Sequence, residues 1–261
     1  MQTDSPSLPD VPSQPEALNP SQQTKAPLLA PAWHTAALII ILLTNSFLTA
    51  LVLGKHPIDP AKPHSNISEY LGTIALQIFL VLFIWVGLRL KKFKMRDLIG
   101  GKWSSPESFL LDIGIALGFW FAALLILTGT AFALGLTGSD HLHEMQRRMG
   151  GLIPNTRTEM GLWLAVSMTA GFAEEIIFRG YLQRQIAALF GNVPVGVLIS
   201  AVLFGLGHGY QGVKNMILIS VFGSLFGMLA LWRKSLRPGM MAHAWQDALA
   251  GLAYRMLTMK N

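Results

Sequence analysis

Long apolar blocks separated by short polar stretches dominate the hydrophobic pattern of this chain. Each block is long enough, or nearly long enough, for a helix to cross the ~30 Å hydrocarbon layer of a bilayer. The pattern predicts an all-α polytopic transmembrane helix bundle of about seven spans, at His34–Leu53, Glu69–Leu90, Phe109–Leu136, Glu159–Phe190, Val193–His208, Val213–Trp232 and Met240–Leu257. The fourth block exceeds one simple span and becomes polar in its last third, so we expect its helix to leave the membrane near Gly180.

Composition agrees with a membrane protein and excludes several kinds of chemistry. Of the 261 residues, 52% are hydrophobic and 13% are charged, about half the charged fraction usual for soluble domains. The chain has no cysteine, which excludes thiol catalysis, disulfides and thiolate metal sites.

Basic residues stand just outside the apolar blocks, where they set membrane orientation. The densest cluster is Lys91, Lys92, Lys94, Arg96 and Lys102. By the positive-inside rule this loop is cytoplasmic, and the amino terminus is then cytoplasmic too. The net charge of +6 is explained by such clusters, and we expect no nucleic-acid partner.

The chain divides into three predicted parts. Residues 1–32 form a Pro/Ser/Gln-rich tail that cannot bury a core and is expected to be disordered. Residues 33–107 form an N-terminal transmembrane hairpin with its basic loop, and residues 108–258 carry the remaining helices.

Several small, aromatic and polar residues receive structural interpretations. Small-residue spacing predicts close helix packing at Gly114 and Gly118 and again at Gly223 and Gly227. Asp112, near a helix start, is expected at the membrane interface. Residues assigned to the interfacial aromatic belt are Trp33, Trp103 and Trp232, and the histidines assigned to the surface are His34, His56, His64, His141 and His143.

Two adjacent carboxylates and an arginine lie inside the fourth apolar block. Ionisable groups at membrane depth cost several kcal/mol unless they are paired or face a wet cavity. Glu175 and Arg179 are four residues apart, which places them on one helix face as a structural ion pair. Glu174 points about 100° away from Glu175 and has no partner on its own helix, so it is the candidate functional group.

Three further polar residues lie in apolar helices at a matching depth. Glu174 and His208 are each 17 residues from the turn at Gly191, so an antiparallel hairpin places them level. His243 lies six residues after Arg237, ~9 Å from the expected cytoplasmic edge, and Asp247 follows it by one turn. We therefore expect a cytoplasm-facing intramembrane cavity that collects all four side chains.

These residue types can activate water. A carboxylate and an imidazole within reach of one water act as general base and acid. His243 could donate a hydrogen bond to the oxyanion of a tetrahedral intermediate. Asp247 either orients His243 or joins the site directly.

Three ordered motifs resemble the CPBP family, which includes type II CAAX prenyl endopeptidases and bacteriocin-processing or immunity proteins. The motifs are Glu-Glu-x-x-x-Arg at 174–179, Phe-x-x-x-His at 204–208 and His-x-x-x-Asn/Asp at 243–247. The resemblance implies that residues 108–258 form a membrane protease domain. It implies that Glu174 and His208 activate water and that His243 and Asp247 stabilise the oxyanion, with Glu175, Arg179 and Phe204 in support. The eukaryotic CAAX enzymes carry Asn where this chain has Asp247, and an ionised Asp can only accept hydrogen bonds.

Other functions compete with a cofactor-free endopeptidase. His208, His243 and a carboxylate could instead ligate zinc, although the chain has no His-Glu-x-x-His motif. A non-catalytic membrane immunity or scaffold protein would keep the same fold, and a transporter fits less well because the polar groups gather on one side. No Gly-x-Ser-Gly pattern surrounds Ser224, which argues against a serine protease of the rhomboid type.

The expected partners are membrane lipid and a hydrophobic, lipidated or membrane-anchored peptide or protein substrate. The expected location is a bacterial plasma (inner) membrane, in which this chain is an integral protein.

Overall fold

A computed structural model describes residues 26–55, 65–136, 138 and 154–258. Most of the tail expected at 1–32 and most of the polar connection expected at 137–158 lie outside the described residues. So do four of the five histidines assigned to the surface, which are His56, His64, His141 and His143.

The described chain is all-helical, as the hydrophobic pattern predicts. Its elements are α1 (Ala32–Lys55), α2 (Ile67–Leu90), α3 (Met95–Ile99), α4 (Pro106–Ala133), α6 (Arg157–Glu174), the π-helix η3 (Glu175–Leu182), α7 (Gln183–Phe190), α8 (Val193–Gly207), the 3₁₀-helix η4 (Gly209–Gln211), α9 (Val213–Arg233) and α10 (Arg237–Thr258). Within the described residues five segments are long and apolar enough to cross a membrane: Ala32–Val52, Ile67–Leu90, Pro106–Ala133, Arg157–Phe190 and Val213–Arg233. The shorter α8 and the more polar α10 complete a bundle of about seven long helices.

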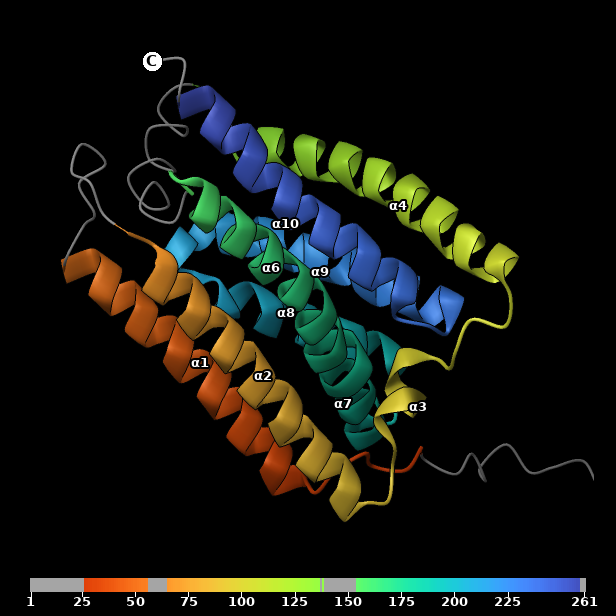
Figure 1. Cartoon of the computed structure of the whole chain (residues 1–261). Helices are drawn as coiled ribbons and strands as arrows, with labels where there is room; N and C mark the ends of the chain where they lie inside the picture. Colours follow the sequence, from red (N-terminus) through yellow and green to blue (C-terminus); the bar gives the residue numbers. More distant parts are fainter. Residues whose placement is uncertain (1–25, 56–64, 137, 139–153, 259–261) are drawn as a thin grey trace, which may run out of the picture.

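The central element is the continuous rod formed by α6, η3 and α7. It packs against α2 on one side and α10 on the other, while α8 and α9 lie behind it as an antiparallel pair. The α1–α2 hairpin closes one flank of the bundle, and α4 covers α10 and α9 on the opposite flank (Figure 1).

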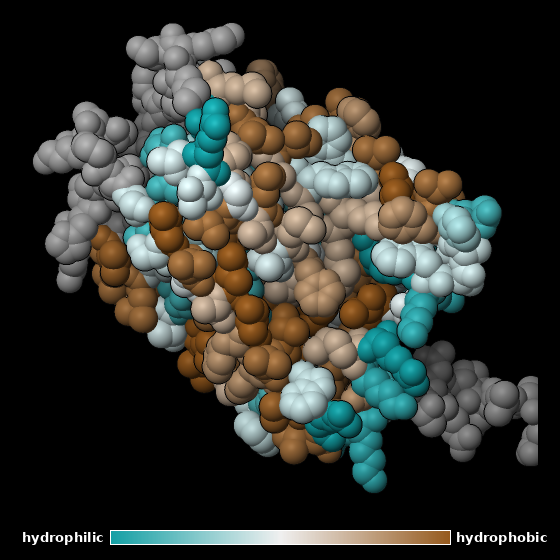
Figure 2. All heavy atoms as spheres, in the orientation of Figure 1, coloured by the Kyte–Doolittle hydropathy of each residue, from teal (hydrophilic) through white to brown (hydrophobic). Residues whose placement is uncertain are grey.

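The outside of the bundle is apolar over its middle, as a surface in contact with lipid requires. Large hydrophobic side chains on α1, α2 and α4 are exposed, including Phe47, Phe79, Leu125 and Phe132. Figure 2 shows apolar side chains over most of the face in view and hydrophilic ones gathered near the ends. The protein is therefore an integral membrane protein.

Local signals at the helix termini explain where the central elements begin and end. The Thr156 side chain accepts a hydrogen bond from the amide of Glu159 at the start of α6, and Asn192 does the same for α8. Gly191 ends α7 in the left-handed conformation, with φ 65°. The turn predicted at Gly191–Asn192 is confirmed, and it starts α8 back along the central rod.

Glycines allow the closest helix contacts, but only at some of the predicted positions. A Cβ on Gly223 would lie 3.1 Å from the ring of Phe204, so this glycine is a packing residue as predicted. Gly171 of α6 lies against the backbone of α10, where a Cβ would be 2.7 Å from the nitrogen of Ala244. The prediction for Gly114 and Gly118 is wrong, because a Cβ at either position would meet no described atom within 4 Å.

Asp112, expected at the membrane interface, is the centre of a buried ion cluster, and its depth in the membrane stays a prediction. It is fully buried, and its two oxygens lie 2.7 Å from Nη2 of Arg233 and 3.2 Å from Nε of Arg237. The indole of Trp103 also donates to it, at 3.0 Å. These two arginines therefore tie α4 to the α9–α10 turn besides marking a membrane face.

The surface assignment of His34 is wrong as well. Its side chain is 1% exposed and stacks on Phe83, with ring centroids 4.1 Å apart. Its Nε2 donates to the Phe83 carbonyl at 2.9 Å, which leaves Nδ1 to accept from the Tyr181 hydroxyl at 3.1 Å. The sequence indicated a surface position because His34 lies at the start of a helix. His34 is buried because α2 and η3 cover this helix start.

Candidate active site

Glu174 lies where the central rod changes its helical type. The α-helix α6 ends at Glu174, and the next eight residues form the π-helix η3. The sequence pattern predicted one uniform α-helix. A π-helix uses i→i+5 hydrogen bonds, is rare, and is frequent at functional sites. Here it carries the second carboxylate, Glu175, and the arginine, Arg179, on its fully buried surface.

The predicted ion pair between Glu175 and Arg179 is present and fully buried. Oε1 of Glu175 lies 3.0 Å from Nη1 of Arg179, and both side chains are 1% exposed. The guanidinium lies 4.4 Å from the ring centroid of Phe204 and 5.2 Å from that of Phe226. Its Nη2 donates to the Gly223 carbonyl at 3.3 Å. Phe204 thus supports the site by stacking on the buried cation.

Glu175 does more than neutralise Arg179, because it also contacts His243. Nδ1 of His243 lies 3.1 Å from the same Oε1 of Glu175. A carboxylate only accepts, so Nδ1 carries the proton and Nε2 is directed toward the cavity. The sequence assigned the orienting of His243 to Asp247 as one of two possibilities, but the group at hydrogen-bonding distance from Nδ1 is Glu175.

Glu174 and Asp247 share the other nitrogen of His243. Nε2 lies 3.6 Å from Oε2 of Glu174 and 3.8 Å from Oδ2 of Asp247. Both distances are beyond a direct hydrogen bond but within the range of a charge interaction or a bridging water. Three carboxylates therefore surround His243, one at Nδ1 and two at the cavity-facing Nε2.

His208 ends α8 and presents one free nitrogen. Its Nδ1 lies 2.9 Å from the Phe204 carbonyl, which can only accept, so Nδ1 donates. The unprotonated nitrogen of the neutral ring is then Nε2. The ring also meets Phe204 edge-on, with centroids 4.9 Å apart. His208 caps its helix and at the same time has an imidazole nitrogen available to accept a proton.

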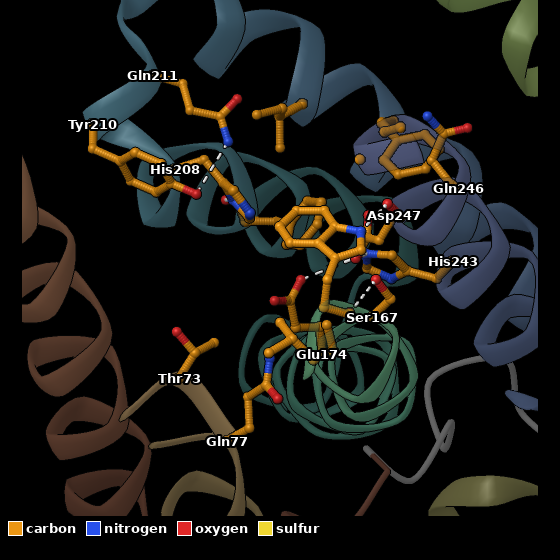
Figure 3. Close-up of a pocket in the computed structure, with 18 of the residues that line it drawn as sticks. Thr73, Gln77, Ser167, Glu174, His208, Tyr210, Gln211, His243, Gln246 and Asp247 are labelled. Atoms are coloured by element: carbon orange, nitrogen blue, oxygen red, sulfur yellow. Dashed lines mark hydrogen bonds and ion pairs between the residues drawn. The ribbon is translucent and has the colours of Figure 1, made fainter. Parts of the chain in front are cut away.

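All four candidate residues line one cavity of about 440 Å³, a size typical of ligand sites. Glu174 lies between two polar walls (Figure 3). His208, His243 and Asp247 lie on one side of it, and Thr73 and Gln77 rise from α2 on the other. The sequence-based division placed α2 in a separate hairpin, yet α2 supplies part of this cavity.

The cavity extends away from the basic loop. Its lining residues include the first half of α2, the middle of α10 and the 208–211 segment, which lie away from residues 91–102 along the bundle. A cytoplasmic basic loop and a cytoplasm-facing cavity, both expected from the sequence, are therefore incompatible. The sequence argument failed because it measured depth from Gly180 and Arg237 and had no evidence for which half of the helices encloses the space.

Several polar residues of the cavity were missed by sequence reasoning. Tyr210 follows His208 and accepts a hydrogen bond from Nε2 of Gln211 at 3.2 Å, so its own hydroxyl proton is available. Burial raises the pKa of Tyr210, which keeps this hydroxyl a donor. On α2, Thr73 and Gln77 are four residues apart in an apolar helix, and this spacing was the signal that could have found them.

The described residues contain no group of three or more His, Asp or Glu side chains with the arrangement of a metal site. Nδ1 of His243 already contacts Glu175, so only Nε2 is left for a ligand on the cavity side. Zinc ligation by His208 and His243 stays a prediction.

The fold and cavity define the class as an all-α integral membrane protein with a titratable intramembrane cavity. Residues 156–249 match the model of the family described as Rce1-like, type II CAAX prenyl endopeptidase Rce1-like. The matched segment runs from the cap of α6 into α10 and contains all four candidate residues and their three supporting residues. The resemblance to the CPBP family is thereby confirmed for this segment, and it indicates a membrane protease. No curated protein and no solved structure gives a significant match.

Proposed function

We propose that this protein is a CAAX-type intramembrane endopeptidase that hydrolyses a peptide bond near the membrane with water activated by Glu174 and His208. The observation that carries the proposal is the unequal use of the two adjacent glutamates. Glu175 pairs with Arg179 and contacts His243. Glu174 instead faces the cavity, as does the imidazole of His208, whose Nε2 is free.

In the proposed reaction Glu174 and His208 hold one water molecule in the cavity. Glu174 accepts a proton as the water oxygen bonds to the scissile carbonyl carbon, and His208 orients the water through Nε2. The oxyanion forms beside Nε2–H of doubly protonated His243, which Glu175 holds in place through Nδ1. The proton then passes to the leaving nitrogen as the carbon–nitrogen bond breaks. The second water proton stays on the added oxygen, so the products are a carboxylic acid and an amine.

Asp247 shares the cavity-facing nitrogen of His243 with Glu174. As an ionised group it can only accept, so its proposed role is to stabilise the doubly protonated His243 rather than to donate to the oxyanion. An Asn at this position would keep an accepting oxygen and lose the charge.

The proposed substrate is a hydrophobic, lipidated or membrane-anchored peptide. The cavity walls are largely apolar, with polar groups confined to the catalytic side and to the α2 wall. A peptide that ends in a prenylated Cys-aliphatic-aliphatic-X sequence fits the family match and such a cavity.

A reconstitution assay tests this proposal. The full chain in proteoliposomes is incubated with an internally quenched ten-residue peptide that ends in farnesyl-Cys-Val-Ile-Met, and cleavage is located by mass spectrometry. We expect cleavage after the lipidated cysteine by the wild type and none by Glu174→Gln. Equal cleavage by the two proteins would end the glutamate mechanism.

The same assay decides the cofactor. We expect that dialysis against a strong zinc chelator leaves the rate unchanged, because the proposed roles need no metal. Loss of activity that zinc restores would make His208 and His243 metal ligands instead.

We further propose a bacterial plasma membrane location with the basic loop and amino terminus in the cytoplasm. Substrate would then reach Glu174 from the other face of the membrane, since the cavity extends away from that loop. Because the chain has no cysteine, a single Cys at Lys94 or at Glu69 can be labelled in intact cells with a membrane-impermeant maleimide. We expect labelling at Glu69→Cys only, and labelling at Lys94→Cys only would reverse the orientation.

A further inference from the structure

A second set of charged side chains lies at the end of the bundle that carries the basic loop. It joins the buried Asp112 of α4 to Arg233, the last residue of α9, and to Arg237, the first residue of α10. The turn between α9 and α10 is fixed to the end of α3, because the amide of Leu236 donates to the carbonyl of Ile99 at 3.0 Å. We call Asp112, Arg233 and Arg237 the Asp112 cluster, and none of its members lines the catalytic cavity.

The Asp112 cluster contains two cations and one anion. Arg233 and Arg237 contact different oxygens of the same carboxylate, at 2.7 Å and 3.2 Å. One positive charge therefore has no ion-pair partner among the residues that the structure describes. Like charges held this close repel each other, most strongly where water is scarce. An anion from outside the protein would remove that repulsion.

Each arginine also keeps a donor nitrogen that the protein does not use. Arg233 donates to Asp112 through Nη2, and Arg237 donates to the hydroxyl of Ser235 through Nε. Within the described chain, Nη1 of Arg233 and Nη2 of Arg237 have no hydrogen-bond partner and are not among the buried unpaired atoms. The two side chains are 26% and 15% exposed. These two nitrogens are therefore accessible from outside the protein.

The Asp112 cluster is more ordered than the signal that sets membrane orientation requires. The guanidinium of Arg237 lies over the indole of Trp103, 5.0 Å from the ring centroid, and that indole donates to Asp112 at 3.0 Å. Arg96 of the basic loop is by contrast 69% exposed, and its contact with Asp97 is 3.9 Å long. Orientation needs only a positive charge near the membrane surface. Guanidiniums held by a buried carboxylate and an indole are in addition preorganised to bind an oxyanion.

The position of the cluster indicates which oxyanion meets it. Arg233 ends the apolar segment Val213–Arg233, which is long enough to cross a membrane. Trp103 is 43% exposed beside the cluster, as is usual for a tryptophan at the membrane–water interface. Lipid phosphates lie at that level, and planar guanidiniums bind phosphate oxygens through paired hydrogen bonds. An anionic phospholipid carries the net negative charge that the cluster lacks.

We propose that the Asp112 cluster binds the headgroup of an anionic phospholipid, whose phosphate oxygens accept hydrogen bonds from Nη1 of Arg233 and Nη2 of Arg237. The phosphate supplies the second anion of the cluster. The acyl chains then lie against exposed apolar side chains of α4, starting with Phe109, which packs edge-on against Trp103 and is 39% exposed. The proposal does not depend on the peptidase reaction, because the cluster and the cavity share no residue.

The test follows thermal unfolding of the full chain in a neutral detergent while lipid is added. It compares two lipids with identical acyl chains, anionic phosphatidylglycerol and zwitterionic phosphatidylcholine. A ligand that binds only the folded state raises the melting temperature, so phosphatidylglycerol should raise it and phosphatidylcholine should leave it nearly unchanged. Equal effects of the two lipids would overturn the proposal. An equal rise with inorganic phosphate, at the concentration of the lipid, would make a free anion the ligand and would overturn it too.

A pair of matched variants locates the site. Arg233→Gln and Arg96→Gln each remove one positive charge from the same end of the protein. Arg233→Gln leaves Asp112 with Arg237 and Trp103, so we expect it to fold. Its Kd for phosphatidylglycerol should rise about tenfold, whereas the Kd of Arg96→Gln should change less than about twofold because that side chain is exposed. Equal changes would show diffuse attraction to anionic lipid and would overturn the site.

Asp112→Asn provides a test of opposite sign that does not need Arg233→Gln to fold. The amide keeps the shape of the side chain and loses the anion, which leaves both guanidiniums without a counter-ion. The melting temperature without lipid should therefore be lower than that of the wild type. Phosphatidylglycerol should then raise the melting temperature by more than it does in the wild type. A smaller or equal rise would show that the lipid phosphate is not the counter-ion of these arginines.

Discussion

Two buried polar clusters lie on the same helical rod and differ in whether all their polar groups have partners within the protein. On one side of the rod, Tyr181 and Gln185 bond to Thr35, His34 and the chain at Leu29–Ala30. On the other side, Glu175 and Arg179 pair with each other and with His243. We call these the neutral network and the charged cluster.

The neutral network is closed. The Tyr181 hydroxyl donates to His34 and accepts from Thr35, whose oxygen accepts in turn from Gln185 at 3.0 Å. Its four hydrogen-bonding side chains are uncharged and at most 3% exposed, and none of them lines the cavity. Such a fully satisfied network gives rigidity and has no capacity left for a ligand.

The charged cluster is open. It continues from His243 to Glu174 and Asp247, whose carboxylates reach the cavity. Within the described residues their ion-pair contacts to His243 are 3.6 and 3.8 Å long. The comparison shows that burial of polar groups does not by itself mark a functional site. The candidate functional site is marked by buried polar groups that line a cavity and can still form hydrogen bonds there.

Replacement of Glu174 by Gln should have the largest effect on function. The amide keeps the size of the side chain and removes the base, so we expect turnover to fall by about 10²–10⁴-fold while folding and peptide binding persist. Steady-state cleavage and a thermal melt on the same preparation check this. A lower melting temperature for Glu174→Gln with unchanged turnover per folded molecule would contradict this. It would show that Glu174, like the neutral network, serves stability and not catalysis.

Arg179→Ala should have the largest effect on stability. It removes the arginine that pairs with the buried Glu175, and breaking a buried pair costs roughly 3–5 kcal/mol. Thermal unfolding in detergent should show a much lower melting temperature and a low yield of folded protein. The matched control is Arg96→Ala, whose side chain is 69% exposed and whose contact with Asp97 is weak, so its melting temperature should stay the same.

Tyr181→Phe should have an intermediate effect, on stability alone. It removes the hydroxyl that joins His34 to Thr35 and leaves both without that partner, at a cost of about 1–3 kcal/mol. We expect a lower melting temperature and unchanged turnover per folded molecule. A fall in turnover without loss of stability would show that the two clusters are coupled through η3.

Asp247→Asn should have the smallest effect. The amide keeps an oxygen that can accept, and the original contact to His243 is 3.8 Å long, so we expect a loss of less than about tenfold in turnover. The pair Asp247→Asn and Asp247→Ala, assayed on one peptide, checks whether the charge or the side chain matters. A loss with Asn as large as that of Glu174→Gln would make the Asp247 charge essential to the state of His243.

The length of the apolar blocks was enough to predict the helices, and the spacing of Glu175 and Arg179 was enough to predict their pair. Both features are local, since a lipid-exposed helix must satisfy its own backbone and residues four apart share a face. The ordered motifs at Glu174, His208 and His243 likewise identified the residues that the structure brings together at one cavity. His34 was misjudged because burial at a helix end depends on which other helices cover it.

What the sequence by itself determined is the class of the molecule and its candidate chemistry, because apolar length and motif spacing are properties of the chain alone. Only the tertiary structure decided that Glu175 holds His243, that η3 is a π-helix, that α2 contributes Gln77 to the cavity and that the cavity extends away from the basic loop. Each of these depends on how helices far apart in sequence cross, as Gly171 of α6 does against α10. The angle and position at which two helices cross depend on how the side chains of both helices pack. A single stretch of sequence contains only one of the two helix surfaces.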